Sequence, residues 1–194
     1  MFFRRVVLGT IAVIAAVALV IPSAEAVNDF YLRFPQFDEQ TEFVNSWGVS
    51  RPDDRTHQGA DLMGTKMAPV VAVLDGVVET MRKGDRAGYY VKLDHGEGTS
   101  SWYMHLNNDT PGTDDGRGGP ENAFAEGLQV GDSVEAGQLI GYVGDSGNAE
   151  WGGAHTHFEF HIRGRAVNPY PYLRDAWERW QLELAIERGE TEYK

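Results

Sequence analysis

The sequence predicts an all-β fold, an antiparallel β-sandwich or open barrel with a groove, followed by one C-terminal amphipathic helix. Three observations support this fold class. From residue 70 onward, short apolar stretches alternate with polar residues. Turns containing glycine separate these stretches, and apolar residues take helical spacing near the C-terminus.

The first residues have the pattern of a secretory signal. Arg4 and Arg5 precede an apolar run from Val6 to Val20, and an Ala-Glu-Ala sequence ends at Ala26. The run is shorter than the ~20 residues of a membrane span, so we favour cleavage after Ala26 over a retained anchor. We expect a secreted or cell-envelope protein with a signal peptide (1–26), an extension (27–42), one main domain (43–170) and a C-terminal helix (171–194).

The chain is acidic and contains no cysteine. Its formal net charge is −12, and removal of the predicted leader, which carries +1, leaves −13. This charge disfavours binding to nucleic acid or, after cleavage, to an anionic membrane. Without cysteine there are no disulfides, and any metal site must use nitrogen and oxygen ligands. We expect a monomer.

The strands begin with a predicted hairpin. Val70 to Leu74 and Val77 to Met81 flank an Asp-Gly turn, and Tyr89 to Leu93 is a further strand. The segments 70–78 and 130–140 resemble each other, which suggests an internal duplication without proving it.

The next strand, Ser100 to Leu106, alternates so that His105 lies opposite an apolar face that includes Trp102 and Met104. Residues 107–127 have no periodicity and predict a long functional or mobile loop. We interpret the acidic residues of this loop as solvated, because they do not match an EF-hand. The later strands are predicted around Val134, Leu139–Val143 and Phe158–Ile162.

After Pro171, helical spacing predicts one amphipathic helix that packs on the sheet. The apolar residues that set this spacing are Leu173, Ala176, Trp177, Trp180 and Leu184.

Histidines occur in three arrangements that suit a metal site. His57 and Asp61 are four residues apart and share one side of an extended segment. His155 and His157 share one face of a strand whose opposite face is apolar. Alone, each arrangement is weak evidence, and His105 alone would be structural.

Together, the arrangements indicate one metal site. A catalytic zinc takes three protein ligands and leaves a fourth position open. The histidines and Asp61 supply such a set with two histidines to spare, although spacing does not decide which histidine of the 155/157 pair is the ligand. His161 and Glu159 share the face of that pair and could be outer partners or merely structural residues, whereas His95 lies in a Gly-rich turn and is interpreted as structural.

These motifs, in this order, resemble the lysostaphin/LytM family of zinc endopeptidases, which has the duplicated-hybrid-motif fold. The resemblance covers residues 43–169. It rests on three motifs: H-x-x-x-D starting at His57, W-Y-M-H-L starting at Trp102 and containing His105, and H-x-H-F-E starting at His155. It implies that His57, Asp61 and His157 bind one zinc ion and that His105 and His155 are catalytic. Thr156 departs from the usual leucine between the two histidines, on the core side of the strand.

The resemblance implies a secreted metallopeptidase that hydrolyses peptide bonds of bacterial cell-wall peptidoglycan. A neutral His105 or His155 could accept a proton from water, and the other could assist the oxyanion or the leaving amine. Two alternatives remain: an inactive relative that binds the wall or activates a hydrolase, and a zinc D,D-carboxypeptidase. The sequence does not indicate which peptidoglycan bond is cut.

Overall fold

The computed structural model describes residues 30–52 and 54–190. The predicted signal peptide therefore lies outside the described residues. Within them, no helix is both long enough and apolar enough to cross a membrane.

Strands account for most of the regular secondary structure of the described residues. In chain order the elements are β1 (Ser50–Arg51), β2 (Arg55–Thr56), β3 (Ala60–Met63), β4 (Pro69–Val71), β5 (Gly76–Gly84), β6 (Gly88–Gly96), β7 (Thr99–Leu106), η1 (Pro120–Asn122), β8 (Ser133–Val134), β9 (Leu139–Tyr142), η2 (Gly147–Ala149), β10 (His155–Ile162), β11 (Arg165–Val167) and α1 (Tyr170–Glu187).

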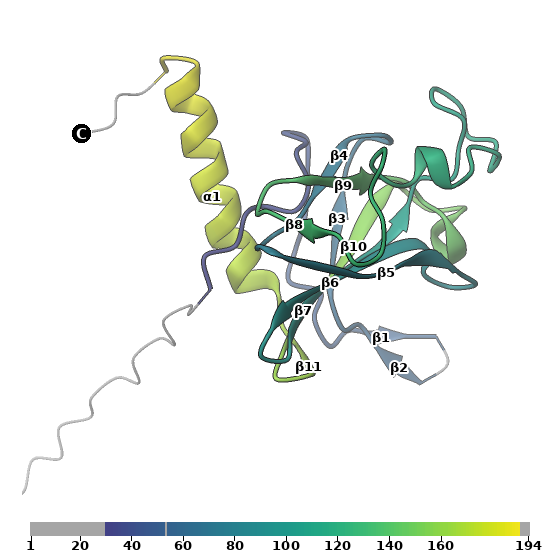
Figure 1. The fold of residues 1–194 in the computed structure, drawn as a ribbon, viewed down its shortest axis with the longest axis horizontal. Helices are drawn as coiled ribbons and strands as arrows, with labels where there is room; N and C mark the ends of the chain where they lie inside the picture. Colours follow the sequence, from purple (N-terminus) through teal and green to yellow (C-terminus); the bar gives the residue numbers. More distant parts are fainter. Residues whose placement is uncertain (1–29, 53, 191–194) are drawn as a thin grey trace, which may run out of the picture.

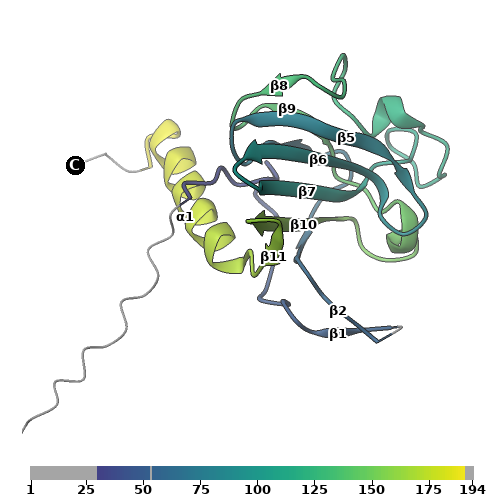
Figure 2. The same cartoon turned by 60° about the horizontal axis from the view of Figure 1, so that its bottom comes forward.

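One antiparallel sheet of seven strands forms the centre of the protein (Figures 1 and 2). Its strands follow the order β11-β10-β7-β6-β5-β8, and β3 also pairs with β10. Two small sheets, β1–β2 and β4–β9, complete the fold. The predicted all-β class with one C-terminal helix is therefore confirmed, in its open rather than closed form.

The predicted hairpin across Asp75 and Gly76 is wrong. β4 pairs with β9, whereas β5 pairs with β6 and β8. Ala72 and Val73, between β4 and β5, are fully buried, so the chain passes through the core from one sheet to the other. Asp75 accepts hydrogen bonds from Ala136 N (2.8 Å) and from the His95 ring (2.8 Å). Consequently, the two similar segments pair with each other, β4 with β9 and β5 with β8.

The buried face of β7 is also opposite to the predicted one. Ser101 and Tyr103 are fully buried, whereas Trp102 and Met104 are partly exposed. Burial of the Tyr103 hydroxyl is possible because it accepts hydrogen bonds from Val73 N and from Ser101 Oγ, both at 2.9 Å. These hydrogen bonds satisfy the polar group of the buried face.

The helix α1 lies beside the N-terminal segment (Figure 1) and contacts it through aromatic side chains. Leu173 is fully buried, and the rings of Trp177 and Trp180 lie 4.8 Å and 5.8 Å from the ring of Phe34. Phe34 is itself only 1% exposed. Residues of the predicted extension therefore contribute to the core between the helix and the sheet.

Candidate active site

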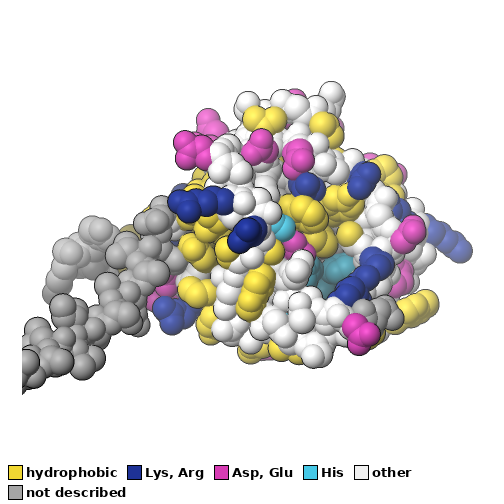
Figure 3. Space-filling model, turned by 90° about the horizontal axis from the view of Figure 1, so that it is seen from below, with side chains coloured by type: hydrophobic (Ala, Val, Ile, Leu, Met, Phe, Trp, Pro, Cys, Tyr) yellow, Lys and Arg dark blue, Asp and Glu magenta, His cyan; other side chains and the backbone are white. Residues whose placement is uncertain are grey.

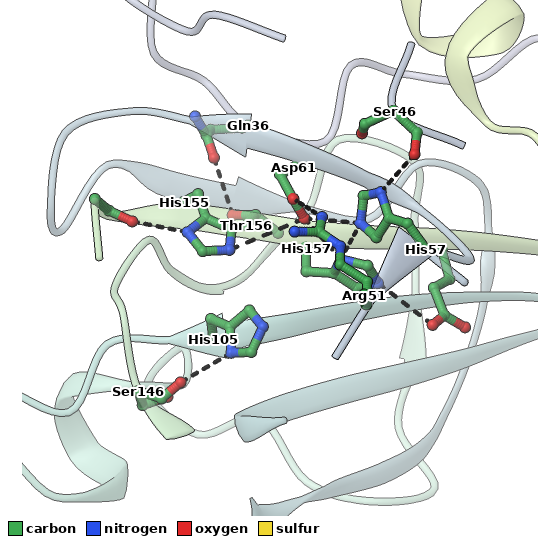
Figure 4. Close-up of polar contacts among 12 residues, drawn as sticks. Gln36, Ser46, Arg51, His57, Asp61, His105, Ser146, His155, Thr156 and His157 are labelled. Carbon is green, nitrogen blue, oxygen red and sulfur yellow. Dashed lines mark hydrogen bonds and ion pairs between the residues drawn. The ribbon is translucent and has the colours of Figure 1, made fainter. Parts of the chain in front are cut away.

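Three potential metal ligands converge at the start of β3 (Figure 4). Antiparallel pairing places His157 of β10 directly opposite Asp61 of β3. Asp61 Oδ1 lies 3.0 Å from His57 Nε2 and 2.8 Å from His157 Nδ1, and these two nitrogens are 3.0 Å apart. Strand register thus brings together side chains that are 100 residues apart in sequence.

The hydrogen bonds of the two histidines favour a cation at their centre. His57 Nδ1 lies 3.0 Å from the carbonyl oxygen of Ser46, and His157 Nε2 lies 3.3 Å from Glu159 Oε1. When each ring carries its proton on that nitrogen, the lone pairs of the other nitrogens point at the same space as the Asp61 carboxylate. Three lone pairs so close together repel one another unless a positive charge lies between them. Two imidazoles and a carboxylate are a typical ligand set for zinc.

The charges at this cluster are strongly coupled. When the ring nitrogens that face Asp61 carry protons instead of contacting a cation, burial would still raise the pKa of Asp61, but the hydrogen bonds and charge from His157 and His57 outweigh burial and hold this pKa far below its usual range. Asp61 therefore remains an anion at every pH at which the protein would be expected to work.

Gly59 allows the His157 ring to approach the cluster. A Cβ atom at residue 59 would lie 2.8 Å from the ring of His157 and 2.4 Å from the carbonyl oxygen of Phe158. These distances are shorter than any ordinary contact, so a side chain here would displace the ligand strand.

His155 and His105 lie beside the cluster (Figure 4), and both line a cleft that opens over it. Their rings are 5.0 Å apart, and His155 Nε2 is 4.0 Å from Asp61 Oδ1. Each Nδ1 contacts a backbone carbonyl oxygen, that of Gly153 at 2.7 Å for His155 and that of Ser146 at 2.8 Å for His105. Because carbonyls only accept hydrogen bonds, both rings in the neutral state carry the proton on Nδ1 and leave Nε2 as a proton acceptor. Burial and the charges of the neighbouring histidines lower the pKa of His105 to about 4.

A backbone irregularity, not simple alternation, places His105 at the cleft. Between Tyr103 and Leu106, β7 has one residue more than the facing part of β6, and His105 has a φ of 60°. A left-handed conformation is unfavourable for a non-glycine residue and is often found at functional sites. Regular alternation would have put His105 on the same buried face as Tyr103, and the bulge turns it toward the cluster of His57, Asp61 and His157.

Further polar partners surround the ligands. Arg51 donates a hydrogen bond to Asp61 Oδ2 at 2.5 Å, so the oxygen that does not face the histidines is also bound. Glu159 connects His157 with His161, whose Nε2 lies 2.7 Å away. Burial opposes the charge of Glu159, but these histidines outweigh it and lower its pKa to about 2. Sequence reasoning singled out Glu159 and His161 as possible partners, but missed Arg51, for which the sequence contained no signal.

A cleft of about 890 Å³ opens over the two groups of histidines. Figure 3 shows histidine side chains at the bottom of a hollow with basic side chains beside it. The lining residues come from β1–β2, from the β5–β6 turn, from η2 and from the histidine strands: Arg51, Pro52, Asp54, Arg55, Thr56, His57, Gln58, Asp61, Arg86, Ala87, Met104, His105, Asn148, Ala149, His155, His157 and Glu159.

The acidic loop after β7 is not wholly solvated, contrary to the prediction. Asp109 is 1% exposed and pairs with Lys66 Nζ at 2.6 Å. The same ammonium group binds Asp114 at 2.6 Å and the buried Asp145 at 2.8 Å. Because Asp145 precedes Ser146, whose carbonyl contacts His105, this cluster anchors the long loop and one wall of the site together.

Of the remaining histidines, His95 is half-buried near the end of β6 and does not line the cleft. Its ring nitrogens contact the carbonyl oxygen of Asp75 (2.8 Å) and Ser101 Oγ (2.7 Å). This arrangement agrees with a structural role.

Comparisons with known proteins agree with this geometry. The L-Ala–D-Glu endopeptidase of Bacillus subtilis (strain 168) is 31% identical over 152 residues, which are 73% of this chain and 42% of the relative. The peptidoglycan DD-endopeptidase ShyA of Vibrio cholerae is 32% identical over 112 residues, 58% of this chain and 22% of the relative. The chain thus spans between about a fifth and two fifths of the length of these curated relatives.

A solved structure, described as a putative glycyl-glycine endopeptidase LytM from Ruminococcus gnavus, superimposes with a TM-score of 0.59. It is 30% identical, and the match covers 75% of this chain and 60% of that one. The sequence pattern of peptidase family M23 matches residues 55–114 and 122–169, a range that contains all five residues of the two histidine groups. The chain therefore belongs to peptidase family M23.

Proposed function

We propose that the protein is an exported zinc-dependent endopeptidase that hydrolyses peptide bonds of bacterial peptidoglycan. The observation that carries this proposal is the convergence of three ligand lone pairs beside two histidines whose Nε2 atoms are left as acceptors. Family membership and the peptidoglycan-cleaving relatives support it. Export rests on the leader pattern of residues 1–26.

His57, Asp61 and His157 would hold the zinc ion. When bound, zinc would supply a Lewis acid that polarises the scissile carbonyl and makes a water molecule more acidic. The outer hydrogen bonds from Arg51 and Glu159 would keep the ligands in place and preserve their protonation states.

The two remaining histidines would handle protons. His105 and His155 offer Nε2 toward the cleft, and either atom can accept a proton from the attacking water because the backbone carbonyls keep the Nδ1 proton in place. The low pKa of His105 keeps this ring neutral at neutral pH, as a general base requires. The ring that holds the transferred proton can then donate it to the leaving amine.

The test is digestion of purified peptidoglycan by the zinc-loaded protein, with muropeptides identified by mass spectrometry and zinc content measured. We expect internal peptide cleavage by the wild-type protein. The His157→Ala variant should lose both activity and bound zinc, whereas His105→Ala should lose activity but keep its zinc. His95→Gln, with folding checked by circular dichroism, serves as the matched control. Release of terminal D-Ala alone would indicate the D,D-carboxypeptidase, and zinc binding without any turnover would indicate the inactive relative.

A further inference from the structure

The cleft is lined by arginine although the chain is acidic overall. Arg51, Arg55 and Arg86 line it, in a chain whose formal net charge is −12. Three carboxylates also line the cleft: Asp61 and Glu159 are bound to histidines of the site, and Asp54 is exposed. With a divalent cation among the ligands, the cleft would therefore present positive charge to a bound peptide.

Arg86 is the arginine most open to a ligand. It lies in the turn between β5 and β6, and its side chain is exposed. Among the described residues, this side chain has no hydrogen bond or ion pair, whereas its carbonyl oxygen accepts a hydrogen bond from Asn148 N at 3.0 Å. The main chain is thus held against η2, and the guanidinium group is available at the edge of the cleft.

Arg51 lies on the β1–β2 ribbon, a different part of the lining. One of its terminal nitrogens binds Asp61 Oδ2, and its side chain is 38% exposed. A guanidinium group has five N–H donors, so this contact leaves donors that can reach a second acceptor. Arginine binds a carboxylate through two parallel hydrogen bonds in one plane. An uncharged amide in place of the carboxylate would bind the same arginine more weakly.

We propose that Arg86 and Arg51 bind free carboxylates of the substrate and thereby select stem peptides over glycine bridges. This inference rests on the proposed function and narrows its substrate class. Stem peptides carry free carboxylates on D-glutamate and on diaminopimelate, next to several of their peptide bonds. A glycine bridge carries no side-chain carboxylate and offers these arginines nothing to pair with.

The test compares stem peptides of identical sequence that differ in one carboxylate. In the first arm the α-carboxylate of D-glutamate is free or amidated, and in the second arm the free carboxylate of diaminopimelate is treated in the same way. For each pair, kcat/KM of the zinc-loaded protein is measured, together with the Kd of the intact peptides for the zinc-loaded His105→Ala variant in low and high salt. Wild-type protein should favour the free acid about fivefold in at least one arm, with a smaller preference in high salt.

Arg86→Gln should reduce that preference to about twofold or less, since a partly exposed ion pair is worth only a small factor. Arg165→Gln is the matched control, because Arg165 is an exposed arginine on β11 that does not line the cleft. Equal treatment of acid and amide in both arms by wild-type protein would overturn the inference, as would a full preference in Arg86→Gln. The Kd values of the intact peptides decide the inference even if no peptide is cut, an outcome that would refute the proposed function separately.

Discussion

Replacement of Lys66 by methionine should destabilise the protein strongly at neutral pH. Lys66 Nζ contacts Asp109, Asp114 and Asp145 at 2.6 to 2.8 Å. Burial opposes the charge of Lys66, but these carboxylates outweigh it and raise the pKa of the amine. Methionine has a similar length and cannot neutralise the carboxylates that remain.

The magnitude follows from the spacing of the two buried carboxylates. Asp109 and Asp145 are 1% and 2% exposed, and the cluster's oxygens lie within 4.8 Å of one another. Two like charges at that distance repel by about 3.5 kcal/mol at an effective dielectric constant of about 20. Protonating one carboxyl group instead, from its ordinary pKa of 3.8, costs about 4 kcal/mol at pH 7 and about 1 kcal/mol at pH 4.5. The expected loss is therefore about 3 to 4 kcal/mol at pH 7 and much smaller at pH 4.5.

The pH dependence has a definite direction. Burial raises the folded-state pKa of Asp145, Lys66 opposes this rise, and loss of Lys66 would raise it further. A carboxyl group whose pKa is raised on folding stabilises the protein below its unfolded pKa, and this stability is lost as the pH rises through the folded pKa. Urea unfolding with a metal chelator present, followed by tryptophan fluorescence, measures the loss at both pH values.

Asp114→Asn is the matched control, because Asp114 is 73% exposed and its loss should change stability by less than about 1 kcal/mol. A loss below about 1 kcal/mol for Lys66→Met at pH 7, or equal losses at both pH values, would refute the reasoning.

Further predictions concern the two groups of histidines. Gly59→Ala should push the His157 ring away from the cluster and lower zinc affinity about 10- to 100-fold without removing a ligand, as measured by competition with a chelator. Gly84→Ala is the control, because a Cβ there would meet only contacts of 3.5 Å or more, and it should bind zinc normally. Equal zinc affinities of the two variants would contradict the prediction. Burial and neighbouring charge lower the pKa of His105 in the folded state from 6.5 to about 4. The neutral ring therefore contributes to the free energy of unfolding above pH 6.5, and this contribution is lost as the pH falls toward 4. Between pH 6.5 and pH 4, the free energy of unfolding of wild type should fall by about 3 kcal/mol more than that of His105→Asn, as measured by urea unfolding. An equal fall in both proteins would argue against the low pKa of His105.

The sequence predicted most where strand period and burial act together. On β10, Thr156 and Phe158 were expected on the core side, and both are fully buried. The strand lies between β3 and β7, so one face must meet the core and the other is left for the histidines. The convergence of His157 with His57 follows from this placement, and the roles of these residues in metal binding and catalysis stay predictions.

Prediction failed where the outcome depends on partners that are distant in sequence. Val70 to Leu74 and Val77 to Met81 read as a hairpin locally, yet β4 finds its partner in β9. The position of His105 depends on one extra residue in β7, which strand alternation does not reveal. Asp109 appeared solvated because its partner Lys66 is 43 residues away. No short-range pattern contains this information.

The site depends on backbone carbonyl groups that belong to loops as much as on its motif residues. Each of the rings of His57, His105 and His155 places Nδ1 against a main-chain oxygen, and a point mutation cannot remove such an oxygen directly. Only displacement of the loop can release the ring and allow the other tautomer. For His105 the carbonyl belongs to Ser146, so the ion pair between Lys66 and the adjacent Asp145 would act through the main chain on the proposed proton acceptor. Loss of that ion pair should therefore weaken catalysis even under conditions in which the protein remains folded.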